Sequence, residues 1–115
     1  MKSGIELIAE ERQRQIAVEG WTPEHDDTHV KGELASAAVA YVKISQRGIV
    51  IDWTLWPWSY NRWKPSKDPI RNFVKAGALI AAEIDRLQRK NLIHQYHYES
   101  DHPASDHDVP GWLQK

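Results

Sequence analysis

The longest regular hydrophobic pattern of the chain lies between Asp68 and Arg89, and it constrains the fold more than any other feature. Apolar residues recur there at helical spacing, at Ile70, Phe73, Val74, Gly77, Ile80, Ala81, Ile84 and Leu87. The Asp68–Pro69 pair in front of them combines a capping acid with proline at the first helical position. The pattern predicts a helix that begins at Pro69, ends near Arg89 and is the central helix of the fold.

Two earlier segments carry helical patterns of their own. The first, residues 3–19, begins after a capping Ser3 and stops at Gly20, with one stripe formed by Ile5, Ile8, Arg12 and Ile16. The second starts either at Thr22–Pro23 or at a cap on Asp27, ends near Ser45, and runs through Val30, Leu34, Ala37, Ala38 and Tyr41. No strand alternation is sustained anywhere. We therefore expect an all-α fold, a small helical bundle of three to four helices.

A tryptophan-rich loop separates the second of these helices from the third. Six of the 115 residues are Trp, and four of the six lie within eleven positions, at Trp53, Trp56, Trp58 and Trp63. Such a cluster forms either a compact mini-core or a stacking surface for a ring-shaped ligand. Beyond a helical domain at 1–90, residues 91–115 form a His- and Asp-rich extension, which is either a polar tail or an accessory metal site.

The bulk composition fits one soluble domain. The chain is 41% hydrophobic and 27% charged, and its net charge of −1 gives no general attraction to nucleic acid or to a membrane. It contains no cysteine, which excludes disulfides and thiolate metal sites. No apolar run approaches the roughly 20 residues that span a bilayer, and the N-terminus lacks the apolar core of a signal peptide. We expect a cytoplasmic protein.

The segment Gly20–Glu33 is the most informative about function. Its last ten residues hold four carboxylates and two imidazoles, a concentration that requires a metal ion or a cationic partner to offset it. A helix over residues 26–33 would place on one face Asp26, His29 and Glu33. Two oxygens and a neutral imidazole suit Mg²⁺ or Mn²⁺, and the neighbouring Asp27 and Glu24 offer further oxygens. The structural alternative is that an acid here only caps a helix.

Glu83 is a second acid of interest, because it borders the apolar stripe of the third helix. A carboxylate against an apolar face needs a partner. If Glu83 faces Glu33 across a helix pair, it completes a metal cage, whereas pairing with Arg12 or Arg14 would make it structural. By comparison we expect Asp85 and Arg86 to be solvated.

Basic residues gather on both sides of the end of the aromatic loop, at Arg62, Lys64, Lys67, Arg71 and Lys75. Alone they are typical of a solvated face. Together with Trp56, Trp58 and Trp63 they favour a nucleotide site, since ring stacking with phosphate pairing is how nucleotides are held.

The ordered set of motifs resembles a family of small phage and prophage proteins over roughly residues 5–89. It consists of Glu11-Arg12-Gln13-Arg14-Gln15, Glu19-Gly20-Trp21-Thr22-Pro23-Glu24-His25-Asp26-Asp27, Gly32-Glu33-Leu34-Ala35, Trp56-Pro57-Trp58, Trp63-Lys64-Pro65 and the run from Val74 to Ile84. That family looks distantly similar to MazG-like all-α nucleoside-triphosphate pyrophosphohydrolases. These release pyrophosphate from NTPs or dNTPs with Mg²⁺ or Mn²⁺, and they form dimers or tetramers.

The resemblance implies a metal site and a substrate site. MazG-type ligands come as E-x-x-E on one helix and E-x-x-D on the next, but this chain has no E-x-x-E, and its only E-x-x-D runs from Glu24 to Asp27. Glu33 transfers to the motif, with Asp26, Asp27 and Glu83 as replacement ligands. We expect Glu33 and His29 to be catalytic, with substrate bound by Arg12, Gln15, Trp21, Trp58, Lys64 and Lys75.

The function expected is therefore metal-dependent pyrophosphohydrolysis of a nucleoside triphosphate in a homodimer or tetramer within the cytoplasm of a bacterial host. The main alternative is a non-catalytic module that binds a nucleotide, or docks a host protein through the aromatic loop. A third possibility makes the acidic cluster a structural polar network.

Overall fold

The computed structural model describes residues 1–46 and 53–101, with the side chains of the last helix described as far as Asn91. Its helices are α1 (Gly4–Ala17), α2 (Pro23–Asp26), α3 (Glu33–Ser45) and α4 (Pro69–Asp101), with a short 3₁₀ helix, η1, at Tyr60–Arg62. No strand occurs within those described ranges. The expected all-α bundle with a tryptophan-rich loop between its main helices is confirmed.

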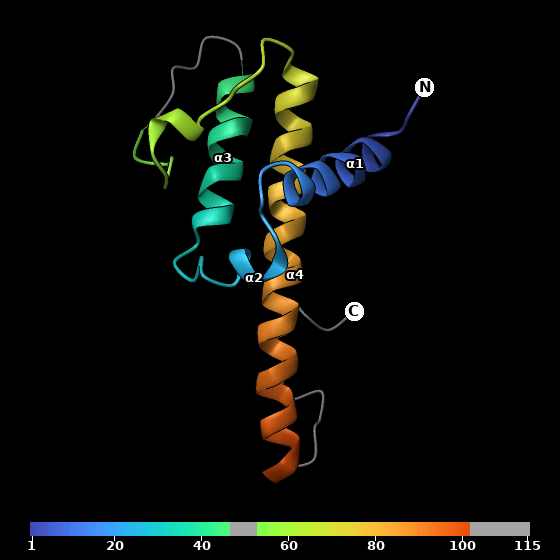
Figure 1. Ribbon diagram of the computed structural model, residues 1–115, viewed down its shortest axis with the longest axis vertical. Helices are drawn as coiled ribbons and strands as arrows, with labels where there is room; N and C mark the ends of the chain where they lie inside the picture. The colour runs from blue at the N-terminus through green and yellow to red at the C-terminus, as the bar shows by residue number, and fades with distance from the viewer. Residues whose placement is uncertain (47–52, 102–115) are drawn as a thin grey trace.

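Helix α4 is the axis of the molecule, as the sequence predicts. Figure 1 shows α3 running along its N-terminal half, α1 crossing it, and α2 lying near its middle. The crossing of α1 is close, since a Cβ placed on Gly77 would lie 2.5 Å from the end of the Ile8 side chain. A residue without a side chain at Gly77 is therefore what allows α1 to reach this face of α4.

The face of α4 that packs into the core differs from the apolar stripe that defines the helix in sequence. Five large members of that stripe are exposed, namely Ile70, Phe73, Ile80, Ile84 and Leu87. The buried positions carry mostly small residues: Asn72, Val74, Ala76, Ala78, Leu79, Ala82 and Arg86. Small residues occupy the buried face of α4 because the facing side of α3 is also rich in alanine. Two alanine-rich surfaces let the helix axes approach closely. Amphipathicity alone would place the bulkiest stripe against the core, and this helix does not follow that rule.

Helix starts in the first half of the chain follow local signals. Ser3 and Glu6 form a reciprocal capping box at the start of α1. Thr22 caps α2, and its hydroxyl accepts from the His25 N–H with Pro23 at the first helical position.

The predicted continuous helix over residues 26–33 is wrong. Helix α2 ends at Asp26 after little more than one turn, and α3 begins anew at Glu33. Gly32 stands between them at φ +78°, a left-handed conformation that few residues other than glycine adopt. Asp26, His29 and Glu33 therefore do not share the face of one helix.

The tryptophans of the loop form a mini-core on the outer side of α3. Trp56 is buried and makes edge contacts with Tyr41, Trp58 and Trp63, at ring-centroid distances of 5.7, 5.2 and 4.8 Å. Trp58 continues the cluster to Trp21 at 5.5 Å. Of the two interpretations of this cluster, the structure shows the mini-core. Only Trp53 among the loop tryptophans is largely exposed.

Helix α4 does not end near Arg89 but continues to Asp101. It thus incorporates the beginning of the expected extension, and His102 and His107 lie outside the described residues, as do the side chains of His94 and His97. No helix in the described part of the chain is long and apolar enough to cross a membrane.

Candidate functional site

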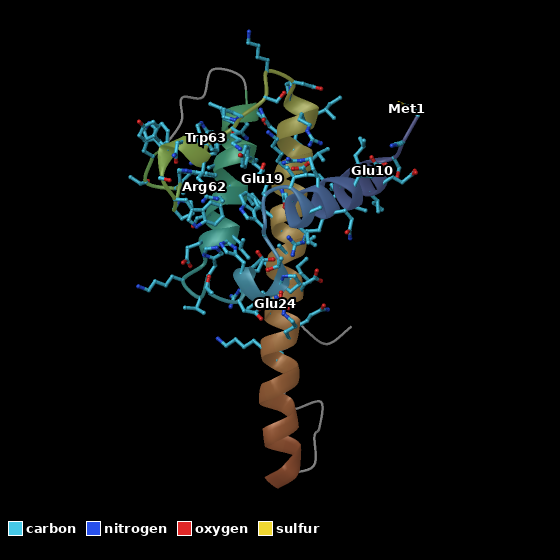
Figure 2. The ribbon with its side chains drawn as sticks, in the orientation of Figure 1. Met1, Glu10, Glu19, Glu24, Arg62 and Trp63 are labelled. Carbon is cyan, nitrogen blue, oxygen red and sulfur yellow. The ribbon has the colours of Figure 1, made fainter. Side chains whose placement is uncertain are left out.

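A polar pocket lies where α1, the α1–α2 connection, α3, α4 and the end of the tryptophan loop meet. The cavity itself is small, about 20 Å³, and is open to solvent; its walls are Glu11, Arg14, Gln15, Glu19, Trp21, Tyr41, Arg62, Lys64 and Lys75. Figure 2 shows Glu19 and Arg62 on the same side of the molecule, over α3. Four cationic side chains against two carboxylates give the pocket a net positive charge. An anionic ligand is the species that such a wall attracts.

Glu11 is the electrostatic centre of this pocket. Its side chain is fully buried and accepts two hydrogen bonds from the Arg14 guanidinium, at 2.8 and 2.9 Å, and another from Arg71. Burial alone would raise the pKa of Glu11, but the hydrogen bonds and charges of Arg14 and Arg71 outweigh it and hold the pKa below 4.5. Glu11 is thus a carboxylate that keeps two arginines in fixed positions.

Lys75 and Tyr41 line the opposite wall. The Lys75 ammonium donates to the carbonyl oxygen of Lys64 at 2.5 Å and lies 5.7 Å from the centre of the Tyr41 ring. Burial, helped by the nearby charge of Arg71, lowers the pKa of Lys75. A partly desolvated ammonium gains more from an anionic ligand than a solvated lysine does, because the interaction is less screened.

Three of the four predicted metal ligands influence the pKa of Arg86, an arginine of α4. Arg86 is buried and pairs with Glu83 at 2.6 and 3.1 Å. The hydrogen bonds that Arg86 donates to the Glu83 carboxylate raise the pKa of Arg86, and the more distant charges of Asp27 and Glu33 raise it further. Arg86 therefore neutralises Glu83, one of the carboxylates that were expected to bind a metal.

Two expectations about these side chains are wrong as a result. Arg86 was expected to be solvated, but only 6% of it is exposed. Glu83 pairs with this neighbour on its own helix and not with Arg12 or Arg14 of α1. Asp27 has a separate partner, the Arg89 guanidinium at 2.6 Å, which also donates to the Pro23 carbonyl and so attaches α2 to α4.

Asp26 is the most deeply buried acid of the segment. One oxygen, Oδ2, accepts from Arg12 at 2.5 Å, and the same guanidinium donates to the Trp21 carbonyl at 3.0 Å. Burial raises the pKa of Asp26, although Arg12 acts against that shift. The other oxygen, Oδ1, is buried and has no hydrogen-bond partner among the described residues. It is a free acceptor inside the protein.

His29 presents a second buried acceptor nearby. Its Nδ1 lies 3.6 Å from Oε2 of Glu33, and its ring packs against Trp58 and His25 at 5.1 and 4.9 Å. Its Nε2 is buried without a partner in the described part of the chain. A proton on Nδ1, facing Glu33, leaves the Nε2 lone pair free, which is the arrangement of histidines that bind metals.

The structure thus sorts the predicted site residues into three groups. Four of the six expected substrate residues line the pocket: Gln15, Trp21, Lys64 and Lys75. Arg12 and Trp58 lie behind it, Arg12 on Asp26 and Trp58 between Trp21 and His29. Among the expected metal and catalytic residues, Asp26, His29 and Glu33 lie near one another, while Asp27 and Glu83 are held in arginine pairs. No three His, Asp or Glu side chains within residues 1–46 and 53–91 are grouped as a metal site.

Four residues of the pocket wall were not predicted from the sequence, namely Glu11, Arg14, Glu19 and Tyr41, whereas Arg62 belongs to the basic group predicted beside the aromatic loop. A signal for two of the missed residues was present. Glu11 and Gln15 are four residues apart, so they share a face of α1, and Arg14 is within one turn of both. Charged residues in such a group on a helix with few large apolar residues indicate a buried polar network.

Comparisons with known proteins add no family to this picture: no family model, no curated protein and no solved structure matches the chain.

Proposed function

We propose that this chain is a metal-dependent nucleoside-triphosphate pyrophosphohydrolase, which cleaves an NTP or dNTP with water to the monophosphate and pyrophosphate. The observation that carries the proposal is the pocket, where Arg14, Arg62, Lys64 and Lys75 surround space that borders Trp21 and Tyr41. Cations suit a polyphosphate, and aromatic rings at its edge suit a base. The pocket therefore offers cationic side chains for the polyphosphate of a nucleotide and aromatic side chains for its base.

Asp26 and His29 are the metal ligands we assign within this proposal. Their free acceptors, Oδ1 and Nε2, are a hard oxygen and an imidazole nitrogen, a donor pair that fits Mg²⁺ or better Mn²⁺. A Mg²⁺-type ion needs only one or two protein ligands when the substrate phosphates and water supply the rest. A bound ion would lower the pKa of a coordinated water and offset phosphate charge.

Glu33 and His29 take the catalytic roles. Glu33 orients the imidazole through Nδ1, and its carboxylate also accepts from the Lys31 backbone N–H at 2.6 Å. Arg12 fixes Asp26 through its other oxygen and binds the Trp21 carbonyl, so the metal ligand and the pocket wall are held by the same guanidinium. Asp27 and Glu83 have a structural role in this assignment, because Arg89 and Arg86 bind them.

The test is pyrophosphate release from a panel of NTPs and dNTPs in Mg²⁺, Mn²⁺ or EDTA. Glu33→Gln is the active-site variant, and Glu24→Gln is its matched control, since Glu24 is an exposed acid of the same segment. We expect metal-dependent release that falls by more than about 100-fold in Glu33→Gln, the scale of a lost proton-transfer group, and that is unchanged in Glu24→Gln. Release that persists in EDTA, or equal loss in both variants, would contradict the proposal.

The same panel measured by calorimetry separates the hydrolase from the non-catalytic nucleotide binder. Saturable binding without product in any metal would establish the binder and overturn catalysis. Docking of a host protein through the loop has less support, because its tryptophans pack on one another and on Tyr41, leaving Trp53 and Tyr60 as its exposed aromatic residues.

A further inference from the structure

Gln15 brings an unused hydrogen-bond acceptor to the wall of the pocket. The residue is buried, with 2% of its surface exposed, and it lines the pocket together with Trp21. Its amide nitrogen donates to Oε2 of Glu11 at 3.3 Å, whereas its amide oxygen, Oε1, is buried and has no hydrogen-bond partner within the described part of the chain. A buried acceptor without a donor is unfavourable, so a donor supplied by a ligand gains more here than it would at a solvated group.

The orientation of this amide follows from the charge of Glu11. Burial raises the pKa of Glu11, but the hydrogen bonds and charges of Arg14 and Arg71 outweigh burial and keep the pKa below 4.5. At neutral pH the side chain is therefore a carboxylate, which only accepts hydrogen bonds. The amide nitrogen of Gln15 must face it, because the reverse orientation would set two acceptors against each other. The amide oxygen is thus directed away from Glu11.

Three of the four cations on the pocket wall are held by other acceptors and do not donate to this oxygen. Arg14 donates to Glu11 and to Glu19. The Lys64 ammonium lies 3.6 Å from a Glu19 oxygen, and the Lys75 ammonium donates to the Lys64 carbonyl. A water molecule or a bound ligand therefore has to supply the missing donor, and a ligand that reproduces the hydrogen bond of the water displaces it without loss.

The size of the pocket limits what that donor can be. The cavity of about 20 Å³ is open to solvent and has room for a group about as large as one water molecule. An aromatic base does not fit inside it, but an amino group that projects from a base does. The Trp21 backbone N–H donates to the main-chain carbonyl of Gln15 at 3.0 Å, which keeps the two residues adjacent. An indole beside the acceptor suits a base that stacks while its amino group reaches the amide.

Amino bases and keto bases differ in the group that would enter this cavity. Cytosine carries an exocyclic amino group, a donor, where uracil carries a carbonyl oxygen, and adenine differs from hypoxanthine in the same way. A carbonyl oxygen directed at Oε1 of Gln15 would set two acceptors together. A site built around a hydrogen bond rejects the analogue that lacks the matching group, because the buried partner is then left unpaired.

We propose that Gln15 selects amino bases over keto bases by accepting, through Oε1, a hydrogen bond from the exocyclic amino group of cytosine or adenine. The base preference rests on the proposed nucleotide site and adds a substrate class to it. Gln15 is then a specificity residue with no part in the cleavage step. Its loss changes the order in which nucleotides are preferred and leaves the chemistry of the site in place.

Calorimetric titration of the full chain in Mn²⁺ tests the preference without turnover. The ligands are the α,β-methylene analogues of CTP, UTP, ATP and ITP, which cannot be cleaved between the α and β phosphates. We expect each amino nucleotide to bind at least about tenfold more tightly than its keto counterpart. Equal affinity for all four would overturn the base preference and leave the nucleotide site standing, whereas no binding of any analogue would overturn both.

A pair of glutamine variants assigns the preference to one side chain. Gln15→Met removes the acceptor and keeps the length of the side chain, and Gln13→Met is its matched control, since Gln13 is an exposed glutamine of the same helix. We expect the ratio of the UTP-analogue to the CTP-analogue dissociation constant to fall to about one in Gln15→Met and to stay at its wild-type value in Gln13→Met. Equal weakening of both analogues with the ratio preserved would make Gln15 purely structural and overturn the proposal. Circular dichroism checks that both variants stay helical, and the wild-type comparison of the four analogues needs neither variant.

The ribose hydroxyl is the other donor that a nucleotide offers to this acceptor. Adding the α,β-methylene analogue of dCTP to the series separates the two sources. We expect Gln15→Met to leave the ratio between the CTP and dCTP analogues unchanged. A change in that ratio, with the ratio between the CTP and UTP analogues preserved, would assign Oε1 to the sugar and overturn the base preference.

Discussion

At the scale of single residues, Arg12 and Asp26 form a buried ion pair that should be costly to disturb. Both side chains are buried, and the carboxylate has one partner at 2.5 Å. We expect Arg12→Met to lower the free energy of unfolding by about 3 kcal/mol, because an unpaired carboxylate would remain in the interior. Urea denaturation at fixed protein concentration measures this.

The matching control replaces both members of the pair. The double variant Arg12→Met, Asp26→Leu leaves no buried charge at this pair. We therefore expect it to regain at least half of the free energy of unfolding that Arg12→Met loses. A double variant as unstable as the sum of the two single variants would show that packing around the pair, and not the charge, sets its cost.

Glu11 makes the stability of the chain sensitive to acid. Its folded-state pKa lies below 4.5, so the unfolded chain binds the proton more readily, and the stability contributed by Glu11 is present above pH 4.5 and lost as the pH falls through the folded-state pKa. We expect the difference in free energy of unfolding between wild type and Glu11→Gln to shrink as the pH falls from about 6 to about 3, the range in which a glutamate protonates. Urea titrations across that range measure it.

Asp26 provides the contrasting case. Burial raises its pKa above 3.8, so its favourable contribution is present below pH 3.8 and is lost as the pH rises through the folded-state pKa. The stability difference between wild type and Asp26→Asn should therefore change with pH in the opposite direction to that of Glu11→Gln. Parallel slopes for both variants would contradict the burial argument.

At the scale of secondary structure, the crossing of α1 over α4 depends on Gly77. A Cβ there would approach Ile8 to 2.5 and 2.8 Å, although alanine favours the helix by about 1 kcal/mol over glycine. We expect Gly77→Ala to destabilise the wild-type chain by about 1 kcal/mol, because overpacking exceeds the gain in helix propensity. Thermal unfolding by circular dichroism measures the change.

The sign of that effect should reverse when the clash is removed. In an Ile8→Ala background, Gly77→Ala has room for its methyl group, and we expect it to stabilise the chain by about 1 kcal/mol through helix propensity. An equal loss in both backgrounds would show that Gly77 matters for another reason than the close approach of α1.

At the scale of the whole molecule, a ligand bound in the pocket would contact five separate parts of the chain. Its wall draws on α1, the α1–α2 connection, α3, the tryptophan loop and α4, so a nucleotide bound as we propose would stabilise the folded state as a unit. At 100 times its dissociation constant a ligand adds about 2.7 kcal/mol. We expect a non-hydrolysable dATP analogue with Mn²⁺ to raise the melting temperature by several degrees.

The effect should depend on the lysine in the pocket. Lys75→Met should reduce this shift, whereas Lys43→Met, which changes an exposed lysine of α3, should leave it unchanged. Equal shifts in wild type and Lys75→Met would place the ligand outside the pocket, and no shift in any protein would remove the support for nucleotide binding.

The sequence alone determined where helices begin, because the signals that start them are local; it did not determine where they end, since α2 stops at Asp26 and α4 continues past Arg89 to Asp101. Ser3 with Glu6, Thr22–Pro23, Gly32 and Asp68–Pro69 each act through the backbone of the next turn, and all four mark helix starts in the structure. The composition of the loop likewise indicated an aromatic cluster. What the local pattern could not show is that the helix begun at Pro23 stops at Asp26 and that a separate helix starts after Gly32.

Tertiary structure decided which faces and which charges meet. Periodicity identifies an apolar stripe on α4 but not its partner, and the alanines of α3 selected the face with smaller residues. The acidic segment required a positive charge, and the sequence left open whether it was a metal or a side chain. Arg86 supplies it for Glu83 three residues away on α4, whereas Arg89 supplies it for Asp27 because packing brings α4 to α2 from 62 residues away in the sequence. Such long-range pairing depends on packing geometry, which no local spacing contains.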